Sequence, residues 1–480
     1  MSSEDLSCAK EESEAGVYAF KIIRLNQGVT ERNFICSLVF SMMSILCTAS
    51  ATGLSPLILL DPEYYNVSQD HIGTLNSIIL IVQSVVKMAA VIPYGHLSDK
   101  IGRRKVIVIG AISYIIGVII VPIQTTIFPG FIVANILIAN SAAALASVPL
   151  LADYIADESR GKASAISGVI IFMTSMIYFA FWQLFTYLGF SLGACYLIFG
   201  IGGFSGLLIN NFGLQGGTFH LRVQKSEAQP QGTTEPPFFD RMKEAFYIFK
   251  ENGWLKISLV LQILGSSDFG VLMSFIALFI KSLFPIGTPT ADQTLAVGKL
   301  QMLTVVMMMV SNVACGYLLD KKNLIIPPCL VALGGGAFAL VLISIATTPT
   351  ALTLYLGCIL FGLTVPGLFP ITSLLNIRNY PADKRGVMNG FSQLVCNVSH
   401  LAIAGGGGLL YDNWQRNAPF LICAALLVLA VVLVLIIYSG MKNEEMMIRK
   451  ENDQKGGVET PEAIDISLEI LEVKKRKSRK

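Results

Sequence analysis

Long apolar stretches separated by short polar turns run through most of this sequence. Residues 163–221 contain no Asp, Glu, Lys or Arg, and neither do residues 323–377. Each of these stretches is long enough for two membrane-spanning helices of about 20 residues with a turn between them. The pattern therefore predicts an all-α, polytopic membrane protein rather than a soluble globular domain.

The same pattern predicts where each span begins and ends. We place twelve spans, near residues 34–60, 71–94, 105–124, 129–153, 162–186, 191–213, 254–281, 298–318, 324–346, 350–377, 387–410 and 417–440. The composition agrees with this interpretation, because only 14% of the residues are charged, against about 25% in a typical soluble domain.

The distribution of positive charge predicts an orientation. The segments that we assign to the cytoplasm, with the span ends beside them, hold 31 of the 35 lysines and arginines, and the outer loops hold three: Lys281, Lys299 and Arg416. Cytoplasmic loops of membrane proteins are enriched in Lys and Arg. We therefore expect both termini in the cytoplasm, with the protein in the plasma membrane or an organelle membrane.

A short basic turn joins the second and third predicted spans. It reads Gly95-His-Leu-Ser-Asp99-Lys-Ile-Gly102-Arg103-Arg104-Lys105. The pattern Gly-x-Leu-x-Asp-x-x-Gly-Arg-Arg resembles the signature loop between helices 2 and 3 of the major facilitator superfamily of transporters. The resemblance implies twelve transmembrane helices in two pseudo-symmetric six-helix bundles.

Two motifs recur in the second half of the chain. Gly95-x-Leu97-x-Asp99 returns as Gly316-x-Leu318-x-Asp320, and the Arg160-Gly161 pair returns as Arg385-Gly386. Both recurrences fall in equivalent predicted loops, as two related bundles require. The domains that we predict are a tail at 1–33, a bundle at 34–213, a linker at 214–253, a bundle at 254–440 and a tail at 441–480.

The resemblance also implies a conformational latch at the cytoplasmic ends of the bundles. Its residues here are Gly95, Asp99, Gly102, Arg103, Arg104 and Asp153. In the superfamily the aspartate approaches the start of helix 11, and the arginine at the position of Arg103 pairs with an acidic residue at the end of helix 4, where Asp153 stands. The alternative is that these charges only fix the topology.

Three ionisable residues fall inside predicted spans: Lys87, Asp268 and His400. Such residues are costly in a membrane and often mark a pathway for a solute or a proton. Lys87 either faces the interior or reaches to the surface with its long side chain, and His400 is either a site residue or a neutral histidine bonded to one hydroxyl. Asp268 lies too deep to reach water along the side chain.

Uncharged polar residues inside the spans are further candidates for a substrate or proton site. Those that we single out are Gln83, Gln262, Gln393 and Asn397, with Asn135, Asn140 and Gln183 as other polar positions. The alternative for each is a hydrogen bond between helices.

The segments outside the spans carry less information. Apolar residues at 238, 239, 242, 245, 246 and 249 form a helical stripe, which predicts an amphipathic helix on the inner membrane surface. The basic end of the C-terminal tail either binds anionic lipid or is simply solvated. Asn66-Val-Ser68 is a glycosylation sequon close to the membrane.

Taken together, these features favour a secondary transporter of a small organic solute that works by alternating access. Proton coupling through Asp268, which would make the protein a symporter, is favoured over simple facilitation. The alternative is a non-transporting sensor or scaffold on the same fold. We expect no enzymatic activity, cofactor, metal or nucleic-acid partner, and we expect a monomer in the lipid bilayer.

Overall fold

The computed structural model describes ten stretches of the chain: residues 18–20, 22–124, 126–148, 150–156, 159–214, 238–266, 268–285, 288–322, 325–380 and 385–454. The chain divides into two compact units, Met1–Val431 and Val432–Lys480. The described part of the second unit is the last portion of helix α19. Everything below concerns the first unit unless it is said otherwise.

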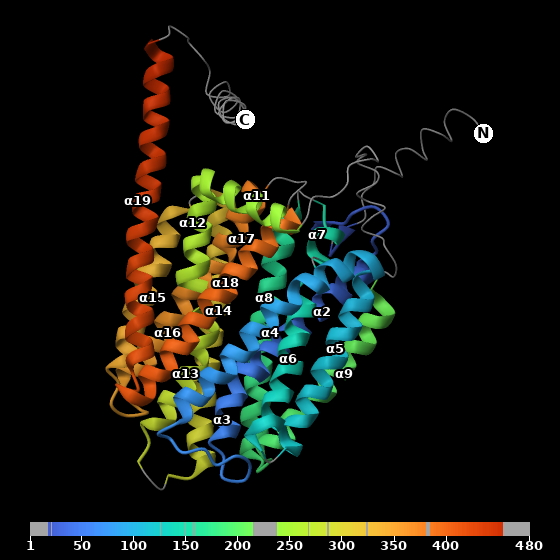
Figure 1. The fold of residues 1–480 in the computed structure, drawn as a ribbon, viewed down its shortest axis with the longest axis vertical. Coiled ribbons are helices and arrows are strands. Elements are labelled where there is room, and N and C mark those ends of the chain that lie inside the picture. The colour runs from blue at the N-terminus through green and yellow to red at the C-terminus, as the bar shows by residue number, and fades with distance from the viewer. Residues whose placement is uncertain are drawn as a thin grey trace, which may run out of the picture. The chain divides into compact units, whose positions relative to one another are not determined.

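The first half of the chain begins with a short hairpin and continues as helices (Figure 1). Its elements are β1 (Tyr18–Ala19), β2 (Ile23–Arg24), α2 (Glu31–Ala49), the π-helical turn η1 (Ser50–Leu54), α3 (Ser55–Leu59), α4 (Ile72–Ile101), α5 (Arg103–Ile123), the π-helical turn η2 (Ile127–Phe131), α6 (Ile132–Ala146), α7 (Leu150–Tyr154), α8 (Arg160–Tyr187) and α9 (Leu192–Gly213).

The second half is also helical. Its elements are α11 (Phe238–Glu251), α12 (Gly253–Leu261), the π-helical turn η4 (Gln262–Ser266), α13 (Asp268–Ser282), α14 (Thr290–Lys322), α15 (Ile326–Ser344), α16 (Leu352–Thr364), the 3₁₀ turn η5 (Val365–Gly367), α17 (Leu368–Asn379), α18 (Arg385–Asn413) and α19 (Ala418–Gln454).

Among the described residues, ten helices are long and apolar enough to cross a membrane. The other two predicted spans, 34–60 and 254–281, are each interrupted by a π-helical turn, η1 in the first and η4 in the second. The chain is thus an all-α, multi-pass membrane protein, and the total of twelve spans stays a prediction.

Tyrosine hydroxyls stabilise the π-helical turn η1. A π-helical turn disturbs the regular backbone hydrogen bonds of a helix. Tyr178 donates its hydroxyl hydrogen to the carbonyl of Ala49, and Tyr196 donates to the carbonyl of Ser50, both at 3.3 Å. Tyr114 lies 3.0 Å from the hydroxyl of Ser50. Buried tyrosines of the first half therefore stabilise the interruption of this helix.

We follow the predicted division of the helices into two groups, both of which belong to one compact unit, Met1–Val431. In the first group α5 packs against α6 and α9, and α2 packs against α8 and α9; in the second group α16 packs against α14 and α15, and α12 packs against α17. We call these groups the first and second bundles. They meet where α4 lies against α18 and where α8 lies against α14.

A short N-terminal segment contacts the end of the first bundle, which the sequence pattern does not predict. Tyr18–Ala19 pairs antiparallel with Ile23–Arg24. The amide of Asn26 then donates to the carbonyl of Tyr154 at 2.9 Å, and the amide of Ala156 donates to the carbonyl of Arg24 at 3.1 Å. These backbone bonds hold part of the predicted tail 1–33 against the loop after α7.

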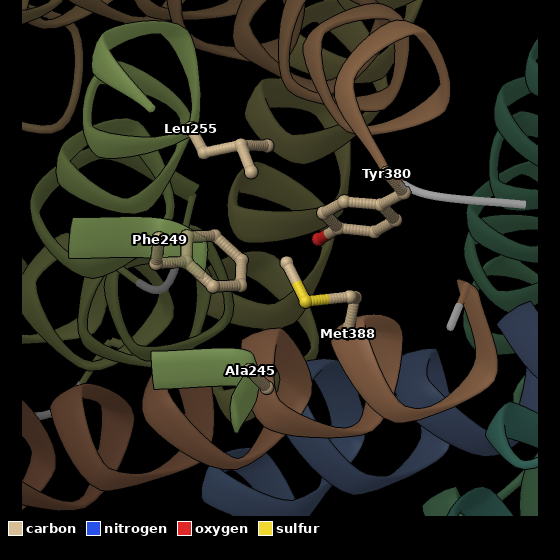
Figure 2. Close-up of a cluster of buried hydrophobic side chains, with 5 residues drawn as sticks. All are labelled: Ala245, Phe249, Leu255, Tyr380 and Met388. Carbon is tan, nitrogen blue, oxygen red and sulfur yellow. The ribbon is translucent and has the colours of Figure 1, made fainter. Parts of the chain in front are cut away.

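Helix α11 of the linker packs on the second bundle (Figure 2). Ala245 and Phe249 on one face of α11 form a buried cluster with Leu255 of α12, Tyr380 after α17 and Met388 of α18. The neighbouring aromatic residues of α11, Phe246 and Tyr247, stay exposed. Part of the apolar stripe that predicts a helix on the membrane surface therefore packs against the protein instead.

Several boundaries differ from the predicted spans: α4 continues to Ile101, so that most of the predicted turn is helical, and α14 begins at Thr290 rather than near residue 298. The fourth span was expected at 129–153, but α6 ends at Ala146 and a separate short helix, α7, carries Asp153. The last span was expected to end at 440, but α19 continues to Gln454. Residues 441–454 are polar but still helical, because this stretch is rich in Glu, Lys, Met and Arg, which form helices readily.

Candidate functional site

The basic turn places its two arginines at the start of α5. Gly102 separates α4 from α5 with φ 95° and ψ 150°, a backbone conformation that is open essentially only to glycine. Arg103 follows, and its Nε lies 3.0 Å from Oδ2 of Asp153 in an ion pair that is about 15% exposed. Arg103 also donates to the hydroxyl of Ser98. The ion pair that the resemblance implies is therefore present, and it joins α5 to α7 within the first bundle.

Arg104 joins two other helices of the same bundle. Its Nε and Nη2 donate to Oδ1 of Asn211 on α9 at 3.2 and 3.1 Å. Asn26, in the segment before α2, donates a hydrogen bond from its side-chain amide to the backbone carbonyl of Asp153 at 2.9 Å. The sequence offers no signal for either partner, because asparagine near a helix end is common in any loop.

The remaining latch residues are described less fully. Gly95 lies within α4 with no protein atom within 4 Å of where a side chain would begin. The side chain of Asp99 lies outside the described part of the structure, as do the side chains of residues 385–387 at the start of α18. The contact between Asp99 and helix 11 stays a prediction.

A polar cluster lies at the middle of the interface between α4 and α18. His400 Nδ1 of α18 is 2.9 Å from the hydroxyl of Ser84 on α4. Lys87 follows Ser84 by three residues, so it lies on the same face of the helix. It is close enough to His400, to Cys396 of α18 and to Cys47 of α2 for electrostatic interaction. Two of the ionisable residues singled out in the spans, Lys87 and His400, therefore come together.

The third ionisable residue cannot be placed in this cluster. Asp268 is the first residue of α13, two residues after the end of η4 at Ser266. Its side chain lies outside the described part of the structure. Its role stays a prediction.

The uncharged polar candidates separate into bonded and exposed residues. Gln83 is fully buried and donates to Oδ1 of Asn135 on α6 at 2.8 Å, within the first bundle. Gln262 donates to Ser258 and accepts from Ser392, which joins η4 to α18. Gln393 is exposed, and Asn397 donates to its backbone carbonyl at 2.9 Å. Gln83 and Gln262 thus have the interhelical bonds that were the alternative to a cavity role.

A carboxylate that the sequence reasoning did not single out joins the two bundles at the far end of α4. The N-cap residue of α4, His71, makes no side-chain hydrogen bond to the helix. Instead, Asp412 near the end of α18 accepts from the backbone amides of Gly73 and Thr74 at 2.9 and 2.6 Å. A carboxylate at a helix N-terminus is stabilised by the free N–H groups and by the helix dipole.

Other contacts between the bundles follow the Asp412 cap along α4. Ser77 donates to the backbone carbonyl of Ala404 at 2.5 Å. Asn76 and Ser274 of α13 exchange hydrogen bonds of 3.1 and 3.2 Å. A Cβ on Gly408 of α18 would overlap the Ser77 hydroxyl and the Gly73 carbonyl. The two helices can approach this closely only because position 408 is glycine.

The bundles therefore meet at one end through direct contacts of α4 with α18 and α13. We call this the Asp412 end, and we call the opposite end, which carries the Gly95–Lys105 turn, the basic end. The hydrogen bonds between α4 and α18 that we find among the described residues lie between Gly73 and Ser84 on α4. Closer to the basic end, a Cβ on Gly95 or on Gly390 would meet no described atom outside its own helix backbone within 4 Å.

Comparisons with known proteins agree with the fold. A short stretch of 86 residues is 36% identical to a protein of Buchnera aphidicola subsp. Schizaphis graminum that is named an uncharacterized transporter. The match covers 18% of this chain and 22% of that relative, so the chain aligns with only about a fifth of the relative's length. The family model described as Major Facilitator Superfamily matches residues 38–404, which is more than half of the chain. The chain belongs to the Major Facilitator Superfamily.

Proposed function

We propose that the protein is a secondary transporter that moves a small organic solute by alternating access between its two bundles. The observation that carries this proposal is the Asp412 cap, in which a carboxylate of one bundle binds the first amides of a helix of the other. Such a contact closes one end of the interface and has to break when that end opens. A polar cluster with Lys87 and His400 lies beyond it, at mid-helix.

The test is transport by the purified full-length protein. A thermal-stabilisation screen over sugars, amino acids, organic acids and nucleosides selects solutes, because a ligand that binds the folded state raises its melting temperature. Each selected solute is then followed by counterflow in proteoliposomes. We expect at least one solute to be exchanged. A protein that binds solutes but exchanges none of them would be a sensor or scaffold, and the proposal would be wrong.

Proton coupling through Asp268 is part of the same proposal. A carboxyl group that alternates between the two sides of a membrane can load and release one proton in each cycle. Asp268→Asn keeps the size and polarity of the side chain but cannot titrate. We expect this variant to lose uphill accumulation in a pH gradient while counterflow exchange survives.

The matched control is Asp292→Asn, which removes an exposed carboxylate from the first turn of α14. It should leave both measurements unchanged. Accumulation that persists in Asp268→Asn would exclude coupling at this residue. Loss of exchange together with accumulation would mean that Asp268 binds the solute itself.

The orientation of the protein is also a proposal. It rests on the concentration of Lys and Arg at the basic end and in the two tails. A protease applied outside intact, right-side-out cells should cut neither the 214–253 linker nor the C-terminal tail. Cleavage of either segment would show that the termini face outward.

A further inference from the structure

We propose that Lys87, Ser84 and His400 form the binding site for the negative group of an organic anion. This inference rests on the transporter function proposed above and names the chemical class of its substrate. The cluster is formed by both bundles, since Lys87 and Ser84 belong to α4 and His400 to α18. A ligand here would contact both halves that have to move.

The residues around Lys87 favour a place in the interface between the bundles over one at the membrane surface. Lys87 is midway along α4 (Ile72–Ile101), and His400 is midway along α18 (Arg385–Asn413). Electrostatic neighbours of Lys87 are Cys47 of α2 in the first bundle and Cys396 of α18 in the second. The side chain therefore faces the interface between the bundles rather than lipid.

The charge of Lys87 is not balanced by a described carboxylate. Among the residues with described side chains, no ion pair of Lys87 is found, and the groups that interact with it are thiols and an imidazole. A cation inside a membrane protein is costly unless it is paired or hydrated. An anionic solute that enters the interface removes this cost and gains a charge-assisted hydrogen bond.

The hydrogen bond to Ser84 determines which ring nitrogen of His400 carries the hydrogen. Ser84 has a single hydroxyl hydrogen, which it donates to the carbonyl of Leu80 at 2.8 Å. The Ser84 oxygen therefore accepts from His400 Nδ1 at 2.9 Å, so that Nδ1 carries a hydrogen. In the neutral ring Nε2 is then an acceptor. The site thus offers a cation for the negative group and an acceptor for a hydroxyl or amide N–H elsewhere on the solute.

The experiment uses Cys396 as a reporter, since this half-buried cysteine is an electrostatic neighbour of Lys87. The full-length protein is treated with two methanethiosulfonates of similar size, one with an anionic sulfonate and one with a cationic trimethylammonium group. In each reaction the thiolate sulfur bonds to the reagent sulfur and methanesulfinate leaves. Mass spectrometry of the peptide that contains Cys396 gives the two rates.

The ratio of the anionic rate to the cationic rate is the quantity of interest. A substitution that changes the reactivity of the thiol changes both rates equally and cancels in the ratio. Relative to the ratio on N-acetylcysteine amide, a neutral thiol, we expect Cys396 to favour the anionic reagent by about tenfold, because a nearby fixed cation attracts anions. Lys87→Gln should bring the ratio close to the reference.

Two further variants serve as controls. Lys87→Arg keeps the charge and should keep the preference, and Lys256→Gln removes an exposed lysine on α12 and should change nothing. A wild-type ratio at or below the reference would overturn the proposal even if Lys87→Gln failed to fold. A preference that survives in folded Lys87→Gln would overturn it as well.

The outcomes separate this inference from the proposed function. If Cys396 favours the anionic reagent but no solute is exchanged, the anion site would stand and the proposed transport function would be wrong. Exchange of a neutral or cationic solute, with no anion preference at Cys396, would keep the transporter and discard the anion site.

Discussion

The two ends of the molecule are held together in different ways. At the basic end, the Arg103–Asp153 ion pair and the Arg104–Asn211 bonds join helices of the first bundle to one another. At the Asp412 end, the carboxylate of Asp412 and the carbonyl of Ala404 bond to α4 across the boundary between the bundles. Bonds within one bundle survive a rigid-body rotation of that bundle, whereas bonds across the boundary have to break. The difference identifies which substitutions should alter the balance between states rather than the stability of a bundle.

The largest expected effect comes from Gly408→Ala. A Cβ at this position overlaps the Ser77 hydroxyl and the Gly73 backbone carbonyl, and overpacking of this kind costs about 1–3 kcal/mol. Since the overlap exists only while α4 and α18 are in contact, the variant should favour states that are open at the Asp412 end. Spin labels at the exposed positions His71 and Asn413 should report longer distances.

Gly406→Ala is the matched control for this substitution. It lies on the same helix, and its Cβ would meet no protein atom within 4 Å. Its label distances should equal those of the unsubstituted protein. Equal distances in Gly408→Ala as well would mean that the close approach of α4 and α18 is not maintained in the membrane.

Asp412→Ala should act in the same direction with a smaller effect. It removes the acceptor for the amides of Gly73 and Thr74, and loss of a helix cap costs about 1–2 kcal/mol, which is roughly a five- to thirtyfold change in the ratio of states. The same spin labels measure it. Asp70→Ala, which removes an exposed carboxylate that bonds only near its own position, should have no effect, and an equal effect of both would point to general electrostatics instead.

The smallest effect is expected at the basic end. Arg103→Ala and Asp153→Ala should each slow transport, and they should change the balance between states only slightly, because the pair lies within the first bundle. The pair is only about 15% exposed, so its coupling should exceed the roughly 1 kcal/mol that exposed pairs reach at most. A double variant whose loss equals the sum of the two single losses would show that the residues do not act as a pair.

Local features of this molecule follow from the sequence more readily than distant ones. The helices follow from hydrophobicity, and the Arg103–Asp153 pair is implied by the resemblance to the superfamily. The Asp412 cap does not, because Asp412 and Gly73 are 339 residues apart and an acidic residue at the end of a span is ordinary. Gln83 and Gln262 resemble cavity residues in the sequence, since a buried glutamine looks the same whether its partner is a neighbouring helix or a solute. The π-helical turn η1 has no sequence signature, because its contacts come from tyrosines of α5, α8 and α9 that meet only in the folded protein.

The packing of α11 on the second bundle has a consequence for the length of the tether between the bundles. With Ala245 and Phe249 buried among Leu255, Tyr380 and Met388, α11 moves with the second bundle. The covalent connection that has to accommodate relative motion is then residues 215–237, between the end of the first bundle and the start of α11. A chain of this length could span about 80 Å if it were fully extended, far more than a bundle rotation requires. In the proposed transport cycle, the contacts along α4, α8, α14 and α18 would therefore limit the motion, and the length of the linker would not.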